Sequence, residues 1–178
     1  QLEGSGVTLF KMGEKDVPTV EEYVGKVLPE GGKLGFDGRV VAMASGQELE
    51  KAVSGKNGSI DYSEDLIDHI WEDRPPLSEE PAFALGEEYT GQSIGEELAR
   101  IREEMKKENC TIHIMASLDD ICWTTNLRGN DIEYFPLLLS YAVITMEDMK
   151  LYVDERKLTE EMKEKLSKDS VSLRPYNA

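Results

Sequence analysis

The sequence contains few of the residues that form reactive or metal-binding centres. Its 178 residues include only two cysteines and two histidines. Cys110 and Cys122 have neither a second cysteine pair nor a companion histidine at zinc-ligand spacing. Neither a disulfide framework nor a zinc site is therefore indicated.

Basic residues are also scarce. The chain has 20 lysines and arginines against 36 aspartates and glutamates, which gives a net charge of −16. Such a charge repels phosphate backbones and anionic membranes, so we predict neither a nucleic-acid nor a membrane partner. The acidic residues are spread along the chain, which is typical of a solvated surface rather than a cation-binding patch.

Long hydrophobic runs are missing as well. No apolar stretch approaches the ~18 residues of a membrane span, and no signal-like segment begins at Gln1. The sequence therefore predicts a cytoplasmic protein. An apolar content of 39% is enough for an ordinary core in one domain or in two small parts of domains.

The few titratable clusters have plain structural interpretations. His113 alternates with isoleucines in a predicted strand, and His69 lies among Ile67, Ile70 and Trp71, whose helical spacing predicts core contacts. The carboxylate pairs Asp119-Asp120 and Asp65 with Asp68 could hold a divalent ion, but they lack the neighbouring ligands of a calcium loop. We predict no metal ligand and no catalytic residue in this chain.

Local patterns predict alternating helices and strands. Capping boxes begin at Thr19, Ser45 and Ser93, each followed three residues later by glutamate. Alternating apolar residues predict strands, two of which form an antiparallel hairpin. The predicted helices follow Thr19, Ser45 and Ser93 and span 159–168, and the predicted strands are 7–10, 33–36, 111–116, 137–144, 150–154 and 170–174. This order predicts an α/β fold with a mixed β-sheet flanked by helices.

A proline-rich stretch divides the chain. Arg74-Pro75-Pro76 and Pro81 predict a stiff, extended connector over residues 75–81, because proline fixes φ and restricts the residue before it. Residues 1–74 and 82–178 then form two separate groups of elements. The final predicted strand, 170–174, corresponds in the second group to the strand 7–10 in the first. This correspondence is a faint internal repeat.

One segment, Asp119–Ile132, follows neither a helix nor a strand period. It contains Trp123, Asn126 and Arg128, our candidate interaction residues, because an arginine fork can grip a carboxylate or backbone carbonyls. In the alternative interpretation, Trp123 anchors a core while Asn126 and Gly129 shape a turn.

The same segment, with Phe135-Pro136 and Ser140-Tyr141-Ala142 after it, resembles the middle domain of three-domain Xaa-Pro aminopeptidases in the creatinase/aminopeptidase P family. The block Asp65–Pro76 resembles that family's linker between its first and middle domains. The resemblance extends from about Val7 to Asp154 and takes in the following short motifs: Lys11-Met12-Gly13, Pro18-Thr19, Leu28-Pro29-Glu30-Gly31 and Leu34-Gly35-Phe36-Asp37.

The resemblance implies a fold like the creatinase/prolidase N-terminal domain, with ribonuclease H-like layering. Residues 1–74 are then the later half of a first such domain, and residues 82–178 the earlier part of a second. It also implies a manganese-dependent parent enzyme that removes the residue preceding proline from peptides. The family's metal ligands belong to a "pita-bread" catalytic domain and match no position here.

We accordingly expect a non-catalytic segment of such an enzyme. Its partners would be the catalytic domain of the same chain and, for the parent, proline-containing peptides; a homodimeric parent is compatible with the resemblance. Trp123, Asn126 and Arg128 would border the substrate cleft or face the catalytic domain. A stand-alone acidic interaction module, or the same region of a creatinase- or prolidase-like hydrolase with another substrate, remains the alternative.

Overall fold

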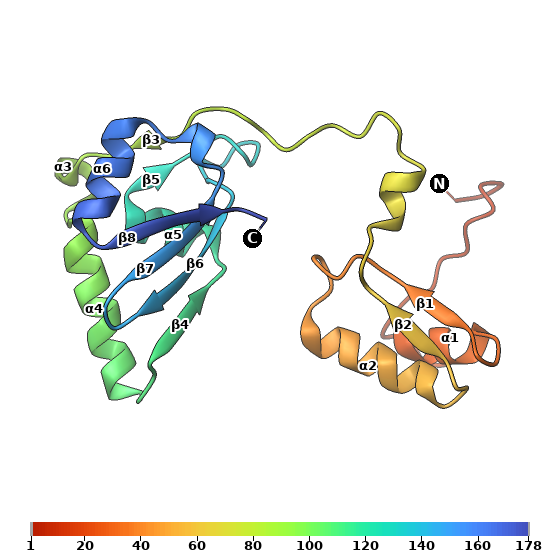
Figure 1. Cartoon of the computed structure of the whole chain (residues 1–178). Helices are drawn as coiled ribbons and strands as arrows, with labels where there is room; N and C mark the ends of the chain where they lie inside the picture. Colours follow the sequence, from red (N-terminus) through yellow and green to blue (C-terminus); the bar gives the residue numbers. More distant parts are fainter. Residues whose placement is uncertain (1, 178) are drawn as a thin grey trace. The chain divides into compact units, whose positions relative to one another are not determined.

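The chain divides into two compact units in the computed structural model, which describes residues 2–177 (Figure 1). The first unit is Gln1–Pro75 and the second is Pro76–Ala178. Within the described residues, every helix is too short or too polar to cross a bilayer.

The first unit is a small two-layer structure. It contains, in chain order, α1 (Val20–Val27), β1 (Lys33–Gly35), α2 (Met43–Ser54), β2 (Ser59–Asp61) and a 3-10 helix η1 (Leu66–His69). The two strands pair in parallel, and α1 contacts α2. Val53 is the one residue of the described part of this unit that is buried. The unit therefore has very little core.

The ends of α1 follow directly from local chemistry. The capping box predicted at Thr19 is present, with the Glu22 N–H donating to the threonine hydroxyl and the Glu22 carboxylate accepting from the Thr19 N–H. At the other end, the Lys56 ammonium donates to the carbonyls of Lys26 and Leu28 at 2.8 Å each. A cation at this end satisfies carbonyls that the helix leaves unpaired.

Three predictions for the first unit were wrong. Residues 7–10 form no strand, because no strand edge in the described residues pairs with them. The helix α2 begins at Met43 after Ala42, so Ser45 lies inside it and does not cap it. Ile67, Ile70 and Trp71 are exposed rather than buried, because the short η1 helix does not continue far enough to bury one face.

The second unit holds the main core around a mixed sheet. Strands β4 (Ile112–Met115), β6 (Ser140–Thr145), β7 (Met149–Val153) and β8 (Val171–Pro175) lie in that order. The first three are antiparallel, and β8 runs parallel to β7 after η2 (Glu155–Lys157) and α6 (Glu160–Lys168). The predicted hairpin and the mixed α/β fold are confirmed.

Helices and short strands complete this unit. They are β3 (Phe83–Ala84), α3 (Glu87–Thr90), α4 (Ile94–Lys107), α5 (Leu118–Thr125) and β5 (Leu127–Arg128), with β3 and β5 paired antiparallel. The predicted capping box at Ser93 opens α4, and Thr159 caps α6. Figure 1 shows α4 and α6 along one side of the sheet.

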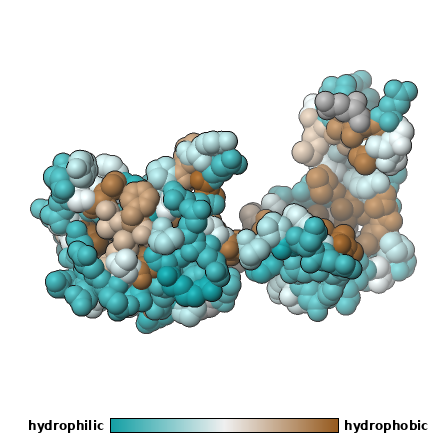
Figure 2. All heavy atoms as spheres, turned by 90° about the horizontal axis from the view of Figure 1, so that it is seen from above, coloured by the Kyte–Doolittle hydropathy of each residue, from teal (hydrophilic) through white to brown (hydrophobic). Residues whose placement is uncertain are grey.

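The burial pattern explains this arrangement. Alternate residues of β6 and β7 are buried, and they pack with Ile94, Leu98 and Met105 of α4 and Leu166 of α6. On β4, the outward Ile112 and Ile114 remain exposed, and His113 is exposed too. Brown hydrophobic residues are visible on the surface of both units in Figure 2.

Candidate interaction site

The segment around Trp123 forms a regular α-helix. Residues 118–125 form α5, where Ser117 accepts the Asp120 N–H, so Asp119 and Asp120 lie in the first turn. Carboxylates are favourable there, because the helix dipole places positive charge at this end. The acidic pair thus has a structural role at the start of α5. The prediction that this segment follows no helical period was wrong for residues 118–125, which form that helix.

Trp123 lies on α5 with its ring half exposed. Its Nε1–H donates to Glu97 Oε1 of α4 at 3.2 Å, and Arg100 Nη1 donates to the same oxygen at 3.3 Å. Glu97 is buried, while Trp123 keeps 52% of its surface exposed. The indole is therefore held in one orientation, while about half of the residue's surface stays accessible to solvent.

Asn126 is turned inward. It ends α5 in the left-handed region at φ 56°, where asparagine is tolerated better than most residues. Its Nδ2 donates to the Gln92 carbonyl at 2.9 Å, and the residue is buried. Asn126 thus joins α5 to the loop before α4.

The Arg128 guanidinium also makes hydrogen bonds within the second unit. Its Nη1 donates to the carbonyl oxygens of Cys122 and Leu127, the latter at 2.8 Å. This one guanidinium nitrogen thus binds two backbone carbonyls, one of the two alternatives that the sequence left open, and Cys122 itself is buried. Burial raises the pKa of the Cys122 thiol, which makes it a poor nucleophile at neutral pH.

A buried ion pair lies under the loop that follows β5. Asp131 Oδ1 and Lys157 Nζ are 2.6 Å apart, and their side chains are 0% and 3% exposed. Asp131 Oδ2 accepts the Leu139 N–H at 2.8 Å. The pair, which no sequence period reveals, fixes the base of the loop against η2.

The loop itself is tightly closed. The Gly129 N–H donates to the Pro136 carbonyl at 3.3 Å, and the Asp131 N–H donates to that of Leu137 at 3.1 Å. A Cβ on Gly129 would come 3.1 Å from the Leu137 oxygen. Asn126 forms the turn that ends α5, as the alternative interpretation expected. Gly129 lies in no turn and instead allows the close approach of Leu137.

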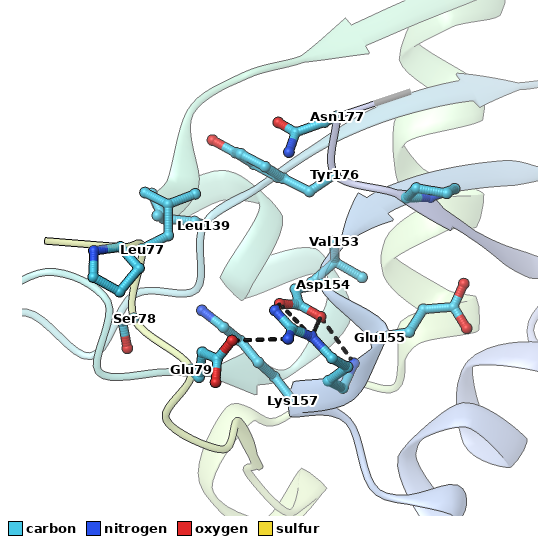
Figure 3. A pocket seen from close by; sticks show the side chains of 13 residues that line it. Leu77, Ser78, Glu79, Leu139, Val153, Asp154, Glu155, Lys157, Tyr176 and Asn177 are labelled. Carbon is cyan, nitrogen blue, oxygen red and sulfur yellow. Dashed lines mark hydrogen bonds and ion pairs between the residues drawn. The ribbon is translucent and has the colours of Figure 1, made fainter. Parts of the chain in front are cut away.

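A cleft of about 560 Å³ lies elsewhere in the second unit (Figure 3). Connector residues Leu77 and Glu79 and the strand-end residues Val153 and Tyr176 line it. Arg156 bridges Glu79 at 2.8 Å and Asp154 at 2.7 Å within it. Trp123, Asn126 and Arg128 do not line this cleft.

Metal ligands do not come together in the part of the chain that the structure describes. No group of three or more histidine, cysteine, aspartate or glutamate side chains there could hold a metal ion. Asp65 and Asp68 instead bind the Arg74 guanidinium at 2.5 and 2.6 Å. His69 contacts Glu64 at 3.2 Å on the surface.

The contacts of Arg74 belong to an arginine–aspartate network of Asp37, Arg39, Asp65, Asp68 and Arg74. Arg39 bonds Asp37 at 3.0 Å and reaches Asp65 at 3.7 Å. The hydrogen bond from Arg74 lowers the pKa of Asp65, and the one from Arg39 lowers that of Asp37. The network joins the end of the first unit to the segment after β1.

Acid is expected to loosen this network. A carboxylate whose pKa is lower in the folded state stabilises the fold above its unfolded-state pKa of about 3.9, and this contribution disappears as the pH falls through the folded value. Because Arg74 lies 5.7 Å from the Trp71 ring centroid, the emission of Trp71 in a Trp123→Phe background should shift on acidification below about pH 4.

The control is Asp65→Asn, which removes the charge at every pH. Its Trp71 emission should already be shifted at neutral pH and should change less on acidification. A Trp71 spectrum that is the same in both proteins and constant down to about pH 2 would rule out this role for the network.

Comparison with known proteins identifies the family of the second unit. The sequence profile of the creatinase/prolidase N-terminal domain matches residues 73–178. The probable Xaa-Pro aminopeptidases P of Sordaria macrospora and Neurospora crassa are 38% and 37% identical over 94% and 95% of this chain. This chain spans 28% and 25% of their lengths.

A solved structure agrees with the sequence comparison. The X-prolyl aminopeptidase of Caenorhabditis elegans, described as a cytosolic enzyme with a di-nuclear active site, matches 96% of this chain with a TM-score of 0.85 and 32% identity. The chain covers 28% of that protein. Because the family profile accounts for more than half of its residues, this chain belongs to the creatinase/prolidase N-terminal domain family.

Proposed function

We propose that this chain is part of the non-catalytic amino-terminal region of a metal-dependent Xaa-Pro aminopeptidase, and that it packs on the catalytic domain and restricts access to the substrate cleft. The relatives named as Xaa-Pro aminopeptidases P support this proposal, since they resemble almost the whole chain. Residues 1–74 and 82–178 would be parts of two tandem domains of that region. The parent would act on proline-containing peptides in the cytoplasm.

The proposed role in restricting substrate access rests on the exposure of Trp123 and on the hydrogen bond that holds its indole. A half-exposed indole held by a buried carboxylate loses little conformational freedom when a peptide packs against it. Asn126 and Arg128 support Trp123 from within, because their polar groups fix the end of α5 and the start of β5. They are positioning residues in this proposal, and Trp123 is the contact.

The metal chemistry would belong to the catalytic domain. When bound there, manganese would supply Lewis-acid chemistry for the hydrolysis. The described residues of this chain offer no ligand set for it, and in this proposal they take no part in bond cleavage. We expect the isolated chain to release no residue from an Xaa-Pro-Pro peptide in the presence of manganese.

The test replaces Trp123 with alanine in the parent enzyme. Loss of an aromatic contact worth about 0.5–1.5 kcal/mol should raise KM roughly 2- to 12-fold for peptides long enough to reach it, with kcat unchanged. Tyr89→Ala, an exposed aromatic of the same unit, is the matched control. Equal KM values for both variants at every peptide length would refute the access role.

A further inference from the structure

We propose that Asn57 of the first unit deamidates spontaneously in the folded protein, through a cyclic imide formed with Gly58, and that the product loosens the contact between the turn after α2 and the loop after α1. The chain has five asparagines, and Asn57 is the one that a glycine follows. This modification is independent of the proposed function, because it needs no other protein or domain.

The reaction needs no partner except water. The Gly58 backbone nitrogen attacks the side-chain carbonyl carbon Cγ of Asn57 and forms a C–N bond. The bond from Cγ to Nδ2 breaks, and the amide nitrogen leaves as ammonia with the proton that the Gly58 nitrogen gives up. Water then opens the cyclic imide at either of its carbonyl carbons, which leaves aspartate or isoaspartate at position 57. A following glycine favours ring closure, because it has no Cβ to hinder the approach.

The backbone at this turn favours both residues of the reactive pair. Asn57 has φ 51°, a left-handed conformation that asparagine adopts more readily than most residues. A Cβ on Gly58 would come 2.8 Å from the Val53 carbonyl oxygen and 2.8 Å from a methyl carbon of Leu28. Only glycine therefore fits after Asn57, and the fold itself keeps a sequence that is prone to imide formation.

The hydrogen bonds at the turn control when the reaction can occur. Asn57 is exposed, and its N–H donates to the Ser54 carbonyl at 3.0 Å. The Gly58 N–H donates to the Val53 carbonyl at 3.0 Å, so the attacking nitrogen is released only when the turn opens. Val53 is the one described residue of the first unit that is buried, and little apolar packing therefore opposes this local opening.

The product disturbs a contact between two loops of the first unit. The Asn57 amide Nδ2 donates to Glu30 Oε1 at 2.6 Å, and the Gly31 N–H donates to the Lys56 carbonyl at 2.8 Å. A carboxylate at position 57 has no N–H to donate, so the first of these bonds is lost and two like charges face each other. Isoaspartate also lengthens the main chain by a methylene group, which displaces the N–H groups that close the turn.

Two other sites in the chain serve as internal comparisons. Asn109 is also exposed and left-handed, with φ 54°, but a cysteine follows it. Asp37 precedes a glycine, but its carboxylate accepts hydrogen bonds from Arg39 at 3.0 Å. These bonds lower the pKa of the Asp37 carboxyl, and an ionised carboxylate resists attack by a nucleophile. Neither site combines an uncharged side chain with a following glycine, as Asn57 does.

The experiment incubates the purified chain in buffers of increasing pH and follows the loss of ammonia by peptide mass spectrometry. Conversion should accumulate at Asn57 and exceed that at Asn109 in the same sample. It should rise with pH, because the Gly58 nitrogen attacks in its deprotonated form. Conversion at Asn57 no greater than at Asn109 in the folded chain would overturn the proposal. Conversion of Asn57 that occurs only in denaturant would overturn it as well.

A variant tests the consequence of the modification separately. Asn57→Asp, which reproduces one product, should lower the protection of the Gly31 amide against hydrogen exchange roughly 2- to 12-fold, as expected for the loss of one hydrogen bond. Adding Glu30→Gln restores a donor opposite the new carboxylate and should recover the protection. The Leu151 amide of the second unit should not respond in either variant. Unchanged protection of Gly31 in Asn57→Asp would contradict the loosening.

Discussion

Replacing Lys157 with methionine is expected to destabilise the second unit by about 3–5 kcal/mol, because it leaves the Asp131 carboxylate buried without its counter-ion. The methionine fills a similar volume, so the loss is electrostatic rather than a packing defect. Denaturant unfolding followed by Trp123 emission in a Trp71→Phe background measures the second unit alone, since the chain has two tryptophans, one in each unit.

The matched control adds Asp131→Asn to Lys157→Met. The amide removes the buried charge and keeps a carbonyl oxygen that accepts the Leu139 N–H. The double variant should therefore be more stable than Lys157→Met alone, by about 1–3 kcal/mol. If Lys157→Met is as stable as the unsubstituted protein, the pair does not fix the loop after β5.

Replacing Leu98 with alanine is expected to cost the second unit about 2–5 kcal/mol. Leu98 is fully buried and belongs to the same core cluster as Ile144 of β6 and Leu151 of β7, so the truncation leaves a cavity in that core. The loss in free energy of unfolding is measured by denaturant unfolding of the second unit. Unfolding is again followed by Trp123 emission in the Trp71→Phe background.

The exposed Leu77 of the same unit provides the comparison. Leu77→Ala removes the same atoms from a site where water already has access, and it should change the stability by less than about 0.5 kcal/mol. Emission of Trp71, followed instead in a Trp123→Phe background, should not respond to either substitution. Equal losses for Leu98→Ala and Leu77→Ala would contradict the position of the core on α4.

The elements that could be predicted are those that carry their own signals. The hydroxyls of Thr19 and Ser93, each three residues before a glutamate, satisfy amide groups that the helix itself leaves unpaired. Alternation along Ser140–Thr145 and Met149–Val153 reflects a sheet with one buried face. The wrong predictions, such as the strand at 7–10, depended on partners that a local pattern cannot supply.

The candidate site was predicted only in part. The sequence singled out Trp123, Asn126 and Arg128, but the direction in which each side chain points depends on α4 and on the loop before it. Glu97, which holds the indole, is one of four glutamates on α4, and no sequence pattern distinguishes it from the three that are exposed. Asp131 and Lys157 are 26 residues apart and share no period, so nothing in the sequence pairs them.

The sequence by itself determined the starts of α1, α4 and α6, the hairpin, the acidic composition and the family resemblance, because each depends on neighbouring residues or on composition. The tertiary structure decided which apolar residues are buried and which arginines donate hydrogen bonds to backbone carbonyls. These depend on contacts between residues far apart in the chain, whose energies become available only when the sheet and α4 come together.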